Sequence, residues 1–148
     1  MRRFRVEQSH TLEAPGGRIE AWVAESFRAR LLGLAGLAAV EPGRALVIPR
    51  CRSVHTFGMR FPIDVAFVGW PTAAPRGAVL ALHEAVGAMR VQRLGGGGVR
   101  GVAALEAPAG TLAALGVRPG TSLLPVRGRL LTSGRERQRA DRGLAGPR

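Results

Sequence analysis

Pro62-Ile-Asp-Val-Ala-Phe-Val68 decides how this chain folds, because it is a run of strand length that is apolar on both sides. Successive side chains of a strand point to opposite faces, which divides the run into two sets. One set is Ile63, Val65 and Phe67, and the other is Asp64, Ala66 and Val68. A strand with two apolar faces is covered on both sides, so we expect this segment at the centre of a sheet.

Further short strands are expected on both sides of this segment. The alternating stretch 18–25 is typical of a half-buried strand. The other strand candidates are 4–7, 11–13, 45–49, 78–86, 99–107 and 122–126. Turn residues separate them, among them Pro15-Gly16-Gly17 and Pro119-Gly120, so the strands are short and close together in sequence.

Two helices are expected among these strands. Ser26 occupies an N-cap position, and apolar residues follow it at helical spacing as far as Ala38. Residues 109–115 predict a second, short helix that ends at Gly116. The sequence therefore predicts an α+β fold, mostly β. We expect a compact, largely antiparallel barrel-like or sandwich-like sheet with one main helix and one short helix.

The composition indicates a single globular domain over residues 1–126, followed by an Arg-rich tail over residues 127–148. The 148-residue chain is 46% hydrophobic, which suits one packed domain. The tail carries seven arginines against two acidic residues and has few apolar ones, so we expect it to be disordered. Such a tail either stays solvated or binds nucleic acid weakly, through phosphates and without sequence preference, and the first of these is favoured here.

The charge balance is strongly basic. All 22 cationic side chains are arginine, against 10 acidic ones, and the net charge is +12. A positive surface attracts acidic partners. No apolar run reaches the roughly 20 residues that cross a bilayer, so no membrane association is expected. The single cysteine excludes an internal disulfide, and Met1 does not open a signal-peptide pattern, which together indicate a cytoplasmic protein.

Residues whose side chains could act as nucleophile, ligand or acid concentrate between Cys51 and Val65. We expect a small cleft here whose lining mixes apolar and polar side chains, as small-ligand sites do. Its expected residues are His55, Phe57, Met59, Asp64 and Glu106.

Asp64 is the most telling of these residues, because a carboxylate in an apolar strand must be paired or neutral. We expect it either to form a structural ion pair with Arg30 or Arg60, or to accept hydrogen bonds from the loop between His55 and Arg60. The alternative, for Asp64 and Glu106 alike, is that the carboxyl group lines the cleft as an acid with a shifted pKa.

An ordered set of motifs resembles a known family. Arg30-Leu-Leu-Gly-Leu34 resembles an R-x-x-G-L element, and Gly43–Pro49 resembles the apolar strand that follows it. His55–Val65 is similar to a segment ending in Pro-Ile/Leu-Asp-hydrophobic. Leu105–Gly110 and Leu115–Gly120 are similar to an L-E-x-x-A-G and G-x-x-x-G-D ending, with Thr121 here in place of the final Asp.

These motifs, over about residues 23–124, resemble "domain of unknown function 192", a family of small uncharacterised microbial proteins. The resemblance implies a fold and a cleft but no established reaction. We therefore expect a soluble, non-catalytic module that binds a small ligand or serves as an accessory protein, with no cofactor and no metal.

Two alternatives stay open from the residues alone. The first is a hydrolase or thiol-dependent enzyme that uses His55 with Asp64 or Cys51, which requires a hydrogen bond between those side chains. The second is an accessory protein that docks acidic partners through its arginines. The sequence leaves the oligomeric state open.

Overall fold

The computed structural model describes residues 9–70 and 76–126 of the chain. This part of the chain contains nine strands and two helices. The strands are β1 Ser9–Ala14, β2 Gly17–Val23, β3 Arg44–Ile48, β4 Ser53–His55, β5 Ile63–Gly69, β6 Gly77–Val86, β7 Val91–Arg93, β8 Val102–Pro108 and β9 Ser122–Pro125. The helices are α1 Phe27–Leu32 and α2 Thr111–Ala114. The predicted fold class, α+β and mostly β with two helices, is confirmed.

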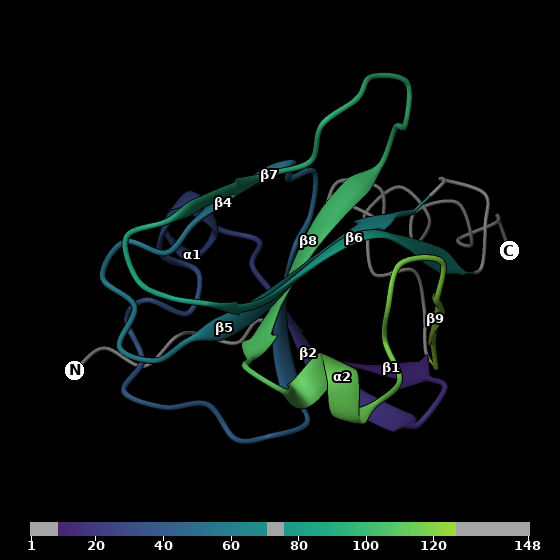
Figure 1. Cartoon of the computed structure of the whole chain (residues 1–148), viewed down its shortest axis with the longest axis horizontal. Coiled ribbons are helices and arrows are strands. Elements are labelled where there is room, and N and C mark those ends of the chain that lie inside the picture. Colours follow the sequence, from purple (N-terminus) through teal and green to yellow (C-terminus); the bar gives the residue numbers. More distant parts are fainter. Residues whose placement is uncertain (1–8, 71–75, 127–148) are drawn as a thin grey trace, which may run out of the picture.

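Seven strands close into a barrel in the order β1-β2-β3-β8-β5-β6-β9, and β4 and β7 form a separate two-stranded sheet (Figure 1). Neighbouring strands are antiparallel except β2 and β3, which run parallel. The connection between those two strands contains α1, as a parallel pair requires a crossover. Of the barrel-like and sandwich-like alternatives, the chain forms the barrel.

The central position predicted for the 62–68 segment is confirmed, because β5 is buried along its whole length and pairs with β6 and β8. Its two faces contribute to two different cores. Ala66 and Val68 lie in the barrel interior, with residues of all seven barrel strands. A second core lies on the outside of the barrel wall and contains Ile63, Val65 and Phe67. This core is covered by α1, by β4 and by the loop that follows β4. We call this second core the outer layer.

The main helix is shorter than predicted. Ser26 is its N-cap as expected, and its hydroxyl accepts a hydrogen bond from the Ala29 N–H at 3.1 Å. The helix ends at Leu32, although the apolar spacing continues to Ala38, because Gly33 takes a positive φ of 52° and turns the chain away.

Two other outcomes concern the two-stranded sheet and the ends of the chain. The three-residue strands β4 and β7 were not predicted, because neither is long enough to show an alternating pattern. The strand candidate 4–7 and the Arg-rich tail 127–148 lie outside the described residues.

Candidate functional site

Asp64 accepts three hydrogen bonds from backbone N–H groups. Its Oδ1 accepts from Ala85 at 3.0 Å, and its Oδ2 accepts from Gly110 at 3.0 Å and from Leu112 at 3.3 Å. The β5–β6 register shifts at this point, so that two residues of β6 lie opposite Asp64, and Ala85 takes a positive φ of 49°. The carboxylate, which is only 1% exposed, therefore holds a β-bulge of β6 and the start of α2.

Neither arrangement expected of Asp64 is formed. It has no ion pair with Arg30 or Arg60, and its hydrogen-bond donors, Ala85, Gly110 and Leu112, lie outside the loop between His55 and Arg60. Arg30 donates to the backbone carbonyls of Pro49 and Arg50, which ties α1 to the segment after β3. Arg60 is exposed. Because backbone donors satisfy Asp64, its burial requires no cation.

Glu106 lies on the opposite face of the sheet from Asp64. It is the β8 partner of Val65, which points into the outer layer, whereas Asp64 is the partner of Ala107, which points into the barrel. The Oε2 atom of Glu106 accepts a hydrogen bond from the Leu34 N–H at 3.1 Å. Burial raises the pKa of this carboxyl from 4.5 to about 7, because that single hydrogen bond offsets only part of the lost hydration.

The five residues expected to line one cleft therefore lie in different parts of the structure. Met59 lies in the outer layer with Glu106, and His55 stacks on Phe57 at 5.0 Å between ring centroids. Asp64 lies on the barrel side of β5. The pleat of the sheet separates the two carboxylates, which the sequence alone placed together.

The enzyme alternative requires a hydrogen bond from His55 to Asp64 or to Cys51, and neither of these bonds is formed. The Cys51 thiol donates to the Ser53 carbonyl at 3.1 Å, and burial raises the pKa of that thiol. The Nδ1 atom of His55 is buried and has no hydrogen-bond partner. A thiol whose pKa is raised is mostly protonated at neutral pH and is a poor nucleophile.

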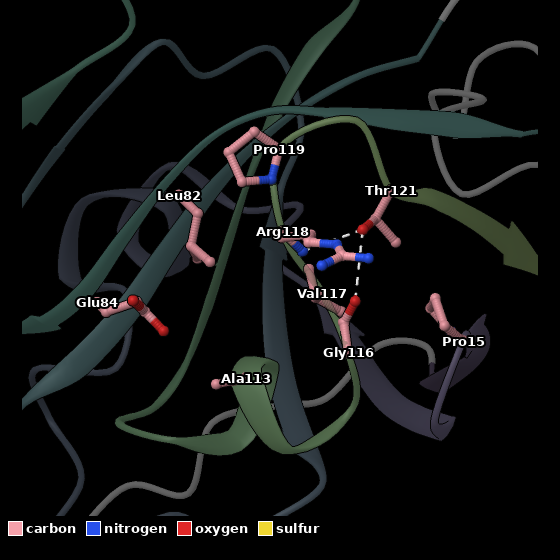
Figure 2. A pocket seen from close by; sticks show the side chains of 9 residues that line it. All are labelled: Pro15, Leu82, Glu84, Ala113, Gly116, Val117, Arg118, Pro119 and Thr121. Carbon is pink, nitrogen blue, oxygen red and sulfur yellow. Dashed lines mark hydrogen bonds between the residues drawn. The ribbon is translucent and has the colours of Figure 1, made fainter.

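A pocket of about 580 Å³ lies at one end of the barrel, between β6, α2 and the turn before β9 (Figure 2). Leu82 and Glu84 of β6 form one side, and Ala113 of α2 forms another. Opposite them lie three residues of the 116–121 segment, Val117, Arg118 and Thr121.

The 116–121 segment is held by its own hydrogen bonds. The Arg118 N–H donates to Thr121 Oγ1 at 3.0 Å, and the Thr121 N–H donates to the Arg118 carbonyl at 2.9 Å. Gly120 and Thr121 exchange backbone hydrogen bonds with Val79 of β6, each at 2.8 Å. The backbone of this wall is therefore fixed, while the Arg118 side chain is exposed.

The pocket carries one charge of each sign. Glu84 and Arg118 both line it, and both residues are exposed. The ion pairs among the described residues are Glu13 with Arg18 and Glu41 with Arg44, so the two charged side chains of the pocket are not in a salt bridge.

Asp64 connects two of the segments that line this pocket. One carboxylate oxygen accepts from Ala85, the neighbour of Glu84, and the other accepts from Gly110 and Leu112, at the start of α2 before Ala113. It is a positioning residue for the pocket, through backbone hydrogen bonds.

Sequence reasoning missed Glu84 and Arg118 as site residues. Arg118 falls in the Leu115–Gly120 motif that resembled the family, which was the one available signal. Among the described residues, no three His, Cys, Asp or Glu side chains are grouped as metal ligands are. No helix in 9–70 or 76–126 is long and apolar enough to cross a bilayer.

Comparison with known proteins identifies the family. The profile of domain of unknown function 192, described as "Uncharacterized ACR", matches residues 10–124, and the chain belongs to this family. No curated protein matches the chain.

Two solved structures share the fold. One is a protein of unknown function from Novosphingobium aromaticivorans DSM 12444, with a TM-score of 0.60 and 21% identity over 78% of this chain and 82% of that one. The other is a protein from Sinorhizobium meliloti 1021 named as a candidate transcription regulator, with a TM-score of 0.60 and 21% identity over 79% of this chain and 92% of that one.

Proposed function

We propose that the protein is a non-catalytic, cytoplasmic binding module that takes a small zwitterionic molecule in the pocket between β6 and α2. The observation that carries this proposal is the pair of opposite charges, Glu84 and Arg118, which border one pocket without neutralising each other. A ligand with an anionic and a cationic group, such as a free α-amino acid, would satisfy both.

The shape and the remaining lining support the same proposal. A volume of about 580 Å³ falls within the range of roughly 300–1,000 Å³ that small-molecule sites occupy. Leu82, Val117 and Pro119 supply apolar contact area in the same lining. The ligand's apolar part would lie against these side chains.

A panel of free amino acids, screened by thermal shift, tests the proposal. A ligand at about 100 times its Kd stabilises the folded state by about 2.7 kcal/mol, which raises the Tm of a chain of this size by roughly 5–10 °C. Isothermal titration of each hit then gives its Kd directly.

Neutral, polar variants assign binding to the pocket. Arg118→Gln and Glu84→Gln should each weaken the hit by about tenfold or more, because each removes one charge partner. Arg100→Gln and Glu25→Gln change the net charge equally at exposed positions outside the pocket and serve as matched controls. If no zwitterion binds, or if the pocket and control variants bind equally well, the proposal is wrong.

A further inference from the structure

An exposed apolar surface lies on the outer side of the two-stranded sheet and shares no residue with the pocket. Phe57, Met89 and Val91 are 46%, 69% and 46% exposed. Val91 is the cross-strand partner of His55, and the His55 ring stacks on Phe57. Val54, which precedes His55 in β4, is buried in the outer layer, so the alternation of the strand directs His55 and its partner Val91 outward. We call His55, Phe57, Met89 and Val91 the β4–β7 face.

Met89 is held outward by a strained backbone. Its φ is +61°, a region that a non-glycine residue rarely adopts. Thr56, which is fully buried, fixes this turn: its carbonyl accepts from the Met89 N–H at 3.1 Å, and its hydroxyl accepts from the Arg90 N–H at 2.8 Å and donates to the Gly87 carbonyl at 2.7 Å. Glycine would fit this conformation without strain, so the turn itself does not explain a methionine here.

The segments that carry the face are rich in arginine and contain no acidic residue. Residues 45–63 and 85–105, which contain β4 and β7, carry six arginines and no Asp or Glu. Of these, Arg90 and Arg93 are exposed directly beside Val91. The apolar face thus has a cationic rim, and its electrostatic complement is an acidic partner.

One edge of β7 offers unpaired backbone groups. Within the described residues β7 pairs with β4 alone, and Figure 1 places it at the margin of the molecule. The Leu94 N–H donates to Arg52 and the Thr56 N–H donates to Arg90, which makes 52/94 and 56/90 hydrogen-bonded pairs of the antiparallel ladder. In such a ladder the alternate residues, Val91 and Arg93, direct their N–H and C=O groups away from β4.

We propose that an extended acidic segment of a partner protein adds a strand to the free edge of β7, with apolar side chains against the β4–β7 face. Strand addition would pair the backbone groups of Val91 and Arg93, and acidic side chains would lie beside Arg90 and Arg93. An anionic lipid surface matches the charge and the apolar area but leaves those backbone groups without partners. A second copy of the chain brings the same arginines to the interface and is repelled.

The probe is a short synthetic peptide in which glutamate and valine alternate, titrated into the full chain and followed by fluorescence anisotropy. Binding should weaken with added salt, since the rim is solvent-exposed. It should be lost when lysine replaces glutamate. It should also be lost when alternate amides are N-methylated along the edge that pairs with β7, because those amides can no longer donate.

Two pairs of variants locate the binding. Arg90→Gln with Arg93→Gln should weaken the peptide by about tenfold or more, whereas Arg18→Gln with Arg44→Gln, which lowers the net charge equally at exposed ion pairs, should not. Met89→Asn should weaken it while leaving the Tm unchanged or higher, since asparagine tolerates positive φ. The matched control is Val126→Asn, at another exposed apolar position.

Several results would overturn the proposal. Binding that persists after N-methylation excludes strand addition. Binding of phosphatidylserine vesicles without binding of the acidic peptide assigns the face to a lipid surface. If the chain self-associates in analytical ultracentrifugation and Met89→Asn abolishes this, the β4–β7 face binds a second copy of the chain. If the peptide affinity falls equally in the Arg90/Arg93 variant and in the Arg18/Arg44 control, net charge alone explains the binding.

Discussion

Replacing Glu106 by glutamine should remove a specific pH dependence of stability. The folded state holds the pKa of this carboxyl at about 7, whereas in the unfolded chain it has its ordinary value of 4.5. Between these values the folded protein keeps a proton that the unfolded chain has released. Deprotonation of the unfolded chain therefore becomes increasingly favourable, and the free energy of unfolding falls as the pH rises.

The size of this effect follows from the interval between the two pKa values. Each pH unit contributes about 1.4 kcal/mol, and the interval is about 2.5 units, so the wild type should lose about 3 kcal/mol between pH 4.5 and pH 7. Glu106→Gln keeps an oxygen that can accept from the Leu34 N–H but does not ionise. The variant should match the wild type near pH 4.5 and exceed its stability by about 3 kcal/mol at pH 8.

Urea unfolding at half-unit steps from pH 4.5 to pH 8 measures this difference, because the variant shares every other titrating group with the wild type. Arg30 and Cys51 lie close enough to couple electrostatically in this region, and both are retained. Parallel stability curves for the two proteins would show that the carboxyl is ionised at an ordinary pKa, and the reasoning from its burial would be refuted.

Three further outcomes are expected. Asp64→Ala leaves the N–H groups of Ala85, Gly110 and Leu112 without their acceptor, the last of them buried, and should cost about 1–3 kcal/mol in urea unfolding; an unchanged midpoint would contradict this. Gly33→Ala places a Cβ 2.6 Å from the Glu106 Oε2 and should destabilise more than Gly43→Ala, a positive-φ glycine with open space around it; equal losses would leave only backbone strain. Removal of the residues after Gly128 should leave the Tm within error by calorimetry, because that segment has little apolar area, and a fall of several degrees would contradict this.

Much of the fold follows from local patterns in the sequence. The alternation of residues 62–68 predicted both the central position of β5 and the two sets of side chains on its faces. Ser26 predicted the start of α1, since an N-cap depends only on the next few residues. The end of α1 could not be predicted, because it depends on the fit of Gly33 against Glu106, which is 73 positions away in the sequence.

The candidate site was harder to predict for a related reason. Burial of Asp64 with hydrogen-bond partners was foreseeable from its apolar neighbours, but the partners are backbone N–H groups, which every residue except proline carries. No sequence pattern distinguishes the three donors that the fold brings to it. The pocket likewise joins β6, α2 and the turn before β9, and only closure of the barrel brings these segments together.

The pocket and the β4–β7 face have no residue in common, and the two buried carboxylates hold different parts of the structure. Asp64 holds the bulge of β6 and the start of α2 at the barrel end, whereas Glu106 holds the turn after α1 in the outer layer. They lie on opposite faces of adjacent strands and share no hydrogen-bond partner, so their effects on local structure should be close to additive. A variant that loses the amino-acid thermal shift should therefore still bind the acidic peptide, and the reverse should hold for Met89→Asn. Joint loss in one variant would mean that both measurements report global unfolding.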